Sequence, residues 1–160
     1  MADIKDPENT IVLETTKGKV VIELMPDLAP NHVARIKELA RANFYDGIVF
    51  HRVIDGFMAQ TGDPTGTGMG GSDKPDLKAE FSNMSHVRGT CSMARSSNPN
   101  SANSQFFIMF APGDFLNGQY TVVGKVVSGM ENVDKIKRGD DANNGSVTDP
   151  DRMIKVTVGK

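Results

Sequence analysis

The stretch from Phe50 to Asp63, FHRVIDGFMAQTGD, decides both the fold and the site that we expect for this chain. Two apolar runs flank Asp55-Gly56, a pair typical of a tight turn between strands. Arg52 is a lone cation in the first run, and Gln60 lies in the second. Such an arginine is either a charge on an exposed edge strand or part of a site, and the stretch alone leaves both open. It contains no obvious nucleophile and no group of metal ligands, which favours chemistry without bond cleavage.

The composition indicates a β-rich domain. The chain has 160 residues, of which 38% are hydrophobic and 24% charged, as expected for one folded core. Its 16 glycines and 8 prolines gather in clusters, so we expect short elements joined by many turns. We therefore expect a single domain over residues 1–160, with residues 1–9 as a loose N-terminal lead-in.

Hydrophobic periodicity predicts about eight short strands and two helices. Alternating apolar residues predict strands over residues 11–15, 19–25, 48–54, 57–60, 90–94, 105–110, 120–127 and 153–158, and 3.6-residue spacing predicts helices over 30–43 and 130–137. Two separated helices cannot cover a parallel sheet of this size, so we expect a closed eight-stranded antiparallel β-barrel capped by the two helices. If side chains fill the interior, the active surface lies on the outside. Phe106 and Phe107 face opposite ways on a strand, so one of them must leave the core face.

The run from Gly66 to Gly71 matches the letters of a G-x-G-x-x-G dinucleotide motif. That motif needs a helix that opens within it, whereas the polar, proline-bounded residues Ser72–Pro75 follow here. We therefore expect a tightly turning loop rather than a nucleotide site. An alternative is a loop whose backbone approaches a bound peptide closely, where a side chain would obstruct.

The histidines and the single cysteine suggest no other chemistry. His32, His51 and His86 are far apart in the sequence, so no metal site and no cofactor are expected. We expect His32 on a helix surface and His51 as a packed, hydrogen-bonded structural residue. Cys91 lies in an apolar run and is expected to be buried and inert. No G-x-S-x-G motif occurs, which does not favour a hydrolase.

Charge and segment composition bear on partners and location. The net charge of −2 gives no general attraction to nucleic acid or to an anionic membrane. Asp3, Asp6 and Glu8 are unlike a secretion signal, and no apolar stretch is long enough to span a membrane. A lone cysteine fits a reducing compartment. We expect a cytoplasmic monomer that binds neither nucleic acid nor membranes.

Several motifs in register resemble those of the cyclophilins. The stretch from Phe50 to Asp63 is similar to the signature strand pair of that family. The runs Ser104–Ile108, Phe115–Gly118 and Val123–Val126 continue the match in order, so that it covers residues 10–158. The resemblance, to the bacterial branch, implies a closed eight-stranded antiparallel barrel with two capping helices. It also implies peptidyl-prolyl cis–trans isomerase activity that assists protein folding, without a covalent intermediate or a metal.

The resemblance also implies a site, position by position. Arg52 corresponds to the catalytic arginine of the family. The implied substrate-binding residues are Phe57, Met58, Phe107 and Leu116 as walls of a proline pocket, Gln60 and Gln105 as groups that hold the peptide backbone, Ala94, Arg95 and Ser96 as a backbone-binding segment, Gly68 in a loop near the groove, and Phe115 and Tyr120. The implied partners are proline-containing peptides and unfolded or partly folded proteins.

The chain departs from the family pattern at three of these positions. Phe115 stands where many eukaryotic members have tryptophan, and Tyr120 where they have histidine, as is common in the bacterial branch. Arg95 stands where many members have asparagine. Phenylalanine lacks the indole N–H donor, so we expect any binding of cyclosporin to be weak.

Two alternative functions remain open from the sequence. A module that only holds prolyl peptides would use the same groove, and Arg52→Ala would distinguish it, because only catalysis would be lost. A small-ligand carrier would need a large cavity inside the barrel, and the large side chains expected there argue against it.

Overall fold

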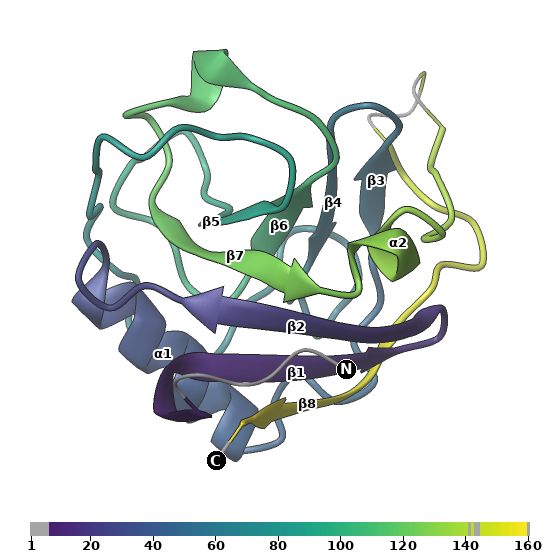
Figure 1. The fold of residues 1–160 in the computed structure, drawn as a ribbon, viewed down its shortest axis with the longest axis horizontal. Helices are drawn as coiled ribbons and strands as arrows, with labels where there is room; N and C mark the ends of the chain where they lie inside the picture. The colour runs from purple at the N-terminus through teal and green to yellow at the C-terminus, as the bar shows by residue number, and fades with distance from the viewer. Residues whose placement is uncertain (1–6, 141, 143–144, 160) are drawn as a thin grey trace.

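The computed structural model describes residues 7–140, 142 and 145–159. The strands in this part are β1 (Thr10–Thr15), β2 (Gly18–Leu24), β3 (Arg52–Ile54), β4 (Met58–Thr61), β5 (Thr90–Met93), β6 (Phe106–Met109), β7 (Val122–Ser128) and β8 (Met153–Val158) (Figure 1). The α-helices are α1 (Pro30–Arg41) and α2 (Met130–Val133), and the 3-10 helices are η1 (Pro7–Asn9) and η2 (Asp114–Leu116). Of the lead-in expected over residues 1–9, η1 is described and residues 1–6 lie outside the described part.

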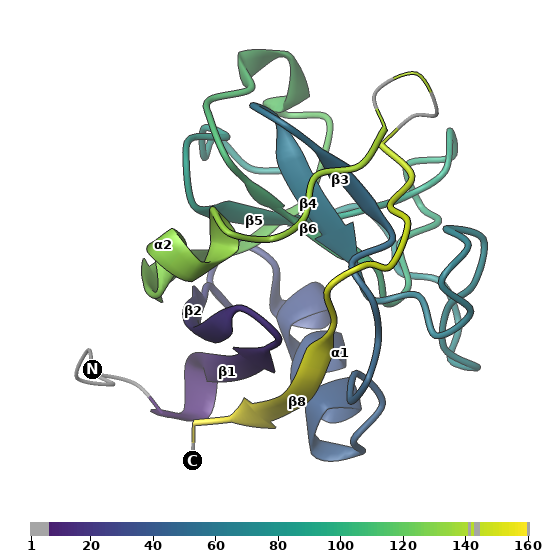
Figure 2. The same cartoon turned by 90° about the vertical axis from the view of Figure 1, so that its right-hand side faces the viewer.

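The strands form one antiparallel sheet that curls around its own interior (Figures 1 and 2). Their order is β3-β4-β6-β5-β7-β2-β1-β8. The mainly β, antiparallel architecture is therefore confirmed. The prediction that the barrel is closed is wrong, because the two edge strands, β3 and β8, form no ladder with each other in the part of the chain that the structure describes.

The chain between α2 and β8 explains why the sheet stays open. It occupies the outer edge of β3, where the Val53 N–H donates to the Gly145 carbonyl at 2.8 Å and the Gly139 N–H donates to the Val53 carbonyl at 2.7 Å. This segment takes the hydrogen bonds that β8 would need. The residues before β3 meet the start of β8, where the Phe50 N–H donates to the Asp151 carbonyl at 2.8 Å and the Met153 N–H donates to the Ile48 carbonyl at 2.8 Å. The sheet is a curled half-barrel.

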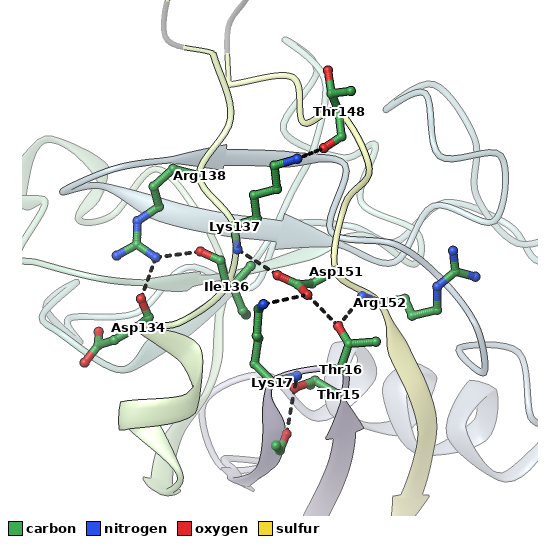
Figure 3. Close-up of polar contacts among 11 residues, drawn as sticks. Thr15, Thr16, Lys17, Asp134, Ile136, Lys137, Arg138, Thr148, Asp151 and Arg152 are labelled. Carbon is green, nitrogen blue, oxygen red and sulfur yellow. Dashed lines mark hydrogen bonds and ion pairs between the residues drawn. The ribbon is translucent and has the colours of Figure 1, made fainter.

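The side chain of Asp151 strengthens this junction (Figure 3). Its Oδ1 accepts a hydrogen bond from the Thr16 hydroxyl at 2.7 Å, and its Oδ2 accepts one from the Lys137 backbone N–H at 2.7 Å. The Lys17 ammonium lies 3.7 Å from Oδ1. One buried carboxylate thus joins the β1–β2 turn, the chain after α2 and the residues just before β8.

Helix α1 packs against β8 through an apolar face. Pro30 starts the helix, where its missing N–H costs nothing, and the buried face includes Val33 and Ile36. His32 was expected on the surface, but it is fully buried, and its Nδ1 lies 2.5 Å from Oε1 of Glu80. The helical period alone could not show this, because a loop distant in the sequence supplies the partner.

Helix α2 is shorter than the helix expected over residues 130–137. It ends at Val133, and the next residues form tight turns in which the Ile136 N–H donates to the Val133 carbonyl at 3.1 Å. The Arg138 guanidinium then donates to the carbonyls of Asp134 and Ile136 (Figure 3). These side-chain bonds satisfy carbonyls that a longer helix would have paired internally.

Buried hydrophobic residues form two separate clusters. The larger one fills the inside of the curled sheet and includes Leu13, Ile22 and Phe106. The smaller one consists of Met58, Phe107, Met109 and Leu116. Alternation along β4 and β6 accounts for the separation, because neighbouring residues on a strand point to opposite faces. The interior is therefore filled, as predicted, and a second apolar surface lies on the outer face of the sheet.

Candidate functional site

A small pocket of about 50 Å³ lies over the smaller cluster, on the outer face of β4 and β6. Its lining residues are Arg52, Phe57, Met58, Gln60, Ala94, Arg95, Phe107, Leu116 and Tyr120. All of them are among the site residues predicted from the sequence. The fold therefore brings together two cations, several apolar walls and one carboxamide from segments that are distant in the chain.

Arg52 is held at the edge of this pocket by a chain of carboxamides. Arg52 on β3 and Gln60 on β4 are directly paired in the sheet, and the Arg52 Nη1 donates to the Gln60 Oε1 at 3.2 Å. The Gln60 Nε2 in turn donates to the Gln105 Oε1 at 2.9 Å. The Gln105 Nε2 donates to the carbonyls of Gly68 and Gly70 at 3.0 and 2.9 Å.

These hydrogen bonds can run in one direction only, and the carbonyls of Gly68 and Gly70 decide it. Because carbonyls only accept, the Gln105 amide must turn its NH₂ toward them and its oxygen toward Gln60. Gln60 must then present its own oxygen to Arg52. The Arg52 guanidinium is therefore the last donor in this series of hydrogen bonds, and it lies beside the apolar walls of the pocket.

Arg52 remains a cation in this setting. Burial lowers the pKa of its guanidinium, and the nearby Tyr120 phenol acts in the opposite direction. Because an arginine starts far above neutral pH, a lowered pKa still leaves it charged at pH 7. A partly desolvated cation forms stronger hydrogen bonds than one in water.

Asp63 organises the loop that carries the carbonyls of Gly68 and Gly70. The Asp63 carboxylate is 1% exposed and accepts hydrogen bonds from the Thr65 hydroxyl at 2.7 Å, the Thr65 N–H at 2.8 Å and the Gly68 N–H at 2.6 Å. Burial would raise the pKa of Asp63, but the bonds from Thr65, Gly70 and Gly68 outweigh it and lower the pKa to about 2. The loop carbonyls that orient Gln105 thus depend on an ionised side chain.

The glycines of this loop are explained by the same carboxylate. Gly68 has φ +89°, a conformation that favours glycine. A Cβ on Gly70 would lie only 2.2 Å from Oδ1 of Asp63. The expectation of a tightly turning loop is confirmed, and the close approach at Gly70 is to a side chain of the loop itself.

The rear wall of the pocket is supported by a buried polar group. The His86 ring stacks on Phe107 with centroids 6.4 Å apart. The His86 Nε2 lies 2.7 Å from the Ser92 hydroxyl, and its Nδ1 lies 3.0 Å from Oδ1 of Asn117. Tyr120 packs edge-on against the Phe107 ring at 5.8 Å. The orientation of Phe107 is therefore set from two sides.

Phe115 differs from the other predicted aromatic residues. It is 71% exposed and does not line the small pocket. Its ring lies 5.5 Å from that of Phe57, which does line the pocket. Phe115 therefore extends the apolar surface outward from the pocket.

A larger depression of about 530 Å³ adjoins the pocket. It contains three of the remaining predicted residues, Gly68, Ser96 and Gln105. Ala94 and Arg95 line both the pocket and this depression, so they form the junction between them. A third hollow, on the other side of Arg52, includes His51, Gly68 and Ser146.

Two other expectations from the sequence have different outcomes. His51 was expected to be hydrogen-bonded, but both of its ring nitrogens are buried without a partner among the described residues. Cys91 is buried, as expected, and burial raises the pKa of its thiol.

The sequence analysis missed the residues that support the site. Met109 was detectable, because it lies two residues after Phe107 on the same strand and so on the same face. Asp63 was detectable from the run Asp-Pro-Thr-Gly, which is typical of a turn stabilised by an aspartate side chain. His86, Ser92 and Asn117 had no local signal, because they meet only in the folded chain.

Comparisons with known proteins agree with this geometry. The family model described as "Cyclophilin type peptidyl-prolyl cis-trans isomerase/CLD" matches residues 10–158. A protein of Brucella suis biovar 1 named "Probable peptidyl-prolyl cis-trans isomerase" is 61% identical, and the alignment covers 98% of this chain and 86% of the relative. A peptidyl-prolyl cis-trans isomerase of Schizosaccharomyces pombe is 45% identical over 75% of this chain and 79% of its own length.

Solved structures show the same fold. The cyclophilin AquaCyp293 from Hirschia baltica superposes with a TM-score of 0.86 at 30% identity, over 96% of this chain and 74% of its own. A Cryptosporidium parvum cyclophilin, crystallised in the presence of the dipeptide Ala-Pro, gives a TM-score of 0.85 at 29% identity, over 93% of this chain and 98% of its own. The chain belongs to the cyclophilin-type peptidyl-prolyl cis-trans isomerase family, and its activity is that of an isomerase. None of the helices in the described part has the length and hydrophobicity that a membrane span requires.

Proposed function

We propose that Arg52 is the catalytic residue and that the small pocket takes the proline ring of an X–Pro substrate. The observation that carries this proposal is the position of the Arg52 guanidinium, oriented by Gln60 at the edge of an apolar pocket. No other cation except Arg95 lines that pocket among the described residues, and Arg95 is bound to backbone carbonyls of the protein.

The reaction requires rotation about a bond with partial double-bond character. Its barrier is about 18–20 kcal/mol, and unaided isomerisation takes tens to hundreds of seconds. When the amide twists, the proline nitrogen loses conjugation and becomes a hydrogen-bond acceptor. A donor that meets this nitrogen stabilises the twisted state more than either planar state, which is the requirement for catalysis.

Arg52 is suited to be this donor. Its guanidinium carries five N–H donors and lies at the edge of the pocket, where Gln60 Oε1 orients it toward the position of the substrate nitrogen and the preceding carbonyl. Phe57, Met58, Phe107 and Leu116 would hold the ring while the preceding carbonyl moves. Each 1.36 kcal/mol of preferential stabilisation gives about a tenfold increase in rate, and a charged donor in a partly dry pocket can supply several such factors. The step needs neither a covalent intermediate nor a metal.

The remaining predicted residues would bind the chain around the proline. Gln60 lines the pocket, and Gly68, Ala94, Ser96 and Gln105 line the adjoining depression. The Cryptosporidium protein, crystallised with Ala-Pro present, supports a prolyl peptide as the ligand. We infer that the substrates are proline-containing segments of unfolded or partly folded proteins. A cytoplasmic location fits the single, buried cysteine.

The experiment that tests this proposal compares Arg52→Ala with wild type on a prolyl peptide. NMR exchange gives the isomerisation rate, and titration of the same peptide gives its affinity. We expect kcat/KM to fall at least about tenfold, while affinity changes by less than about threefold. Arg152→Ala, at an exposed residue outside the pocket, should keep the wild-type rate.

The same data distinguish the outcomes. An unchanged rate in a folded Arg52→Ala protein would remove Arg52 from its role. If the variant loses catalysis but still protects an unfolded client from aggregation as wild type does, peptide holding rather than isomerisation is the main activity. Circular dichroism and the urea midpoint of each variant establish that the fold is intact.

A further inference from the structure

Arg95 lies at the junction between the proline pocket and the larger depression. It lines both of them, together with Ala94. Its guanidinium carbon lies 4.5 Å from the centre of the Tyr120 ring, so the cation is stacked on a wall of the proline pocket. A peptide that runs from the pocket into the depression must pass this cation.

The guanidinium is fixed by the backbone on two sides. Its Nε and Nη2 both donate to the Gln119 carbonyl, at 3.1 and 2.8 Å, and its Nη1 donates to the Ser96 carbonyl at 2.9 Å. A guanidinium has five N–H donors, and these bonds use three of them. Two donors therefore remain, on a group whose orientation is already set, so binding a ligand costs little side-chain entropy.

The charge of Arg95 is not neutralised by the protein. No carboxylate among the described residues forms an ion pair with it, and its bonds go to neutral carbonyls and an aromatic face. Arg52 lies in the same pocket, and no described Asp or Glu lines that pocket. Asp76 lines only the larger depression, where its Oδ1 accepts a hydrogen bond from Asn103. The junction is therefore positive in a chain whose net charge is −2.

We propose that Arg95 makes this isomerase selective for segments with an acidic residue at one of the two positions that precede the proline. The two remaining N–H donors, one on Nη1 and one on Nη2, can donate to carboxylate oxygens, and such charge-assisted hydrogen bonds are stronger than neutral ones. A lysine at the same place would meet two guanidinium groups and be repelled. This inference rests on the proposed role of the pocket in binding proline.

The test measures kcat/KM for two peptide series by NMR exchange at low salt. In one series Glu, Gln or Lys directly precedes the proline, and in the other it lies one residue further from it. With wild type we expect the Glu peptide to exceed the Lys peptide by about tenfold in at least one series. The ratio should fall to within about twofold in Arg95→Gln, and also in wild type at about 1 M salt, where the Debye length is short.

A matched variant separates local from general electrostatics. Arg41→Gln removes the same charge at an exposed position at the end of helix α1, and it should keep the wild-type Glu-to-Lys ratio. A wild-type ratio near one in both series, or a ratio that survives in Arg95→Gln, would overturn the proposal. Failure of the proposed catalytic site would give a different result. In that case wild type and Arg52→Ala would isomerise the Gln peptides at the same rate.

Discussion

Phe106 and Phe107 are neighbours on β6, but they pack into different hydrophobic clusters. Phe106 belongs to the cluster inside the curled sheet, where its ring meets Tyr45 edge-on at 5.6 Å. Phe107 belongs to the cluster beneath the pocket and stacks on His86. The main core and the proposed substrate pocket thus depend on two adjacent residues that point in opposite directions.

This division predicts opposite phenotypes for two matched substitutions. Phe106→Ala should lower the free energy of unfolding by about 3–5 kcal/mol, because it opens a cavity in the main core. Phe107→Ala should destabilise less, since its cluster borders solvent, but it should lower kcat/KM on a prolyl peptide by about tenfold or more. Urea unfolding and the isomerase assay on both variants check this. Equal losses of stability would contradict the separation of the clusters.

The direction of the carboxamide chain can be tested at Gln105. Gln105→Leu removes the link between the loop carbonyls and Gln60, so Arg52 should become mobile and kcat/KM should fall several-fold to about tenfold. Gln105→Glu should be worse, because a carboxylate cannot donate to the carbonyls of Gly68 and Gly70 and is repelled by them. The ¹⁵N resonances of the Arg52 side chain would report its mobility directly. A Glu variant more active than the Leu variant would refute the assigned direction.

Asp63 should make stability depend on acid pH. Its pKa of about 2 lies below the value of 3.8 for a free side chain, so its stabilisation is complete above pH 4 and is lost as pH falls toward 2. The difference between these two pKa values corresponds to a contribution of about 2 kcal/mol to the free energy of unfolding at neutral pH. Asp63→Asn should lose about this amount at pH 7, and the gap from wild type should close near pH 2.

Thr65→Val provides a graded control for the same group. It removes the hydroxyl that donates to Asp63 but keeps the backbone donor, so its loss of stability at pH 7 should be intermediate. Urea unfolding between pH 2 and 7 measures all three proteins. A constant gap between wild type and Asp63→Asn across this range would show that the carboxylate contributes no such linkage.

Phe115 should limit the binding of cyclosporin. The ring is largely exposed beside Phe57, so a larger side chain can be placed there without repacking the core. Phe115→Trp adds an indole N–H donor, and one hydrogen bond should tighten the Kd by up to about tenfold. Phe115→Leu adds no donor and should give no gain. If Phe115→Trp also gives none in a calorimetric titration, Arg95 at the junction is the residue to change next.

The sequence was informative wherever the signal is local or periodic. Alternation located the strands, and it showed that Phe106 and Phe107 must diverge. The family motifs then gathered Arg52, Phe57 and Leu116 into one site, and the structure brings these residues together around one pocket.

The sequence failed where a distant segment decides the outcome. The closed barrel was wrong, because the residues around Gly139 and Gly145 take the edge of β3. His32 is buried because Glu80, far along the chain, covers it. Polar loop residues carry no periodic signal that would reveal such contacts, so neither partner could be inferred from its own neighbourhood.

The covered edge of β3 has a consequence for the proposed binding of unfolded chains. An exposed strand edge offers free N–H and C=O groups and is a template for intermolecular pairing and aggregation. β3 carries Arg52, so an open edge there would lie beside the pocket at which we propose that unfolded clients bind. By pairing Val53 with Gly139 and Gly145, the chain occupies that edge itself. A client can then engage the pocket through its proline without adding a strand to the sheet.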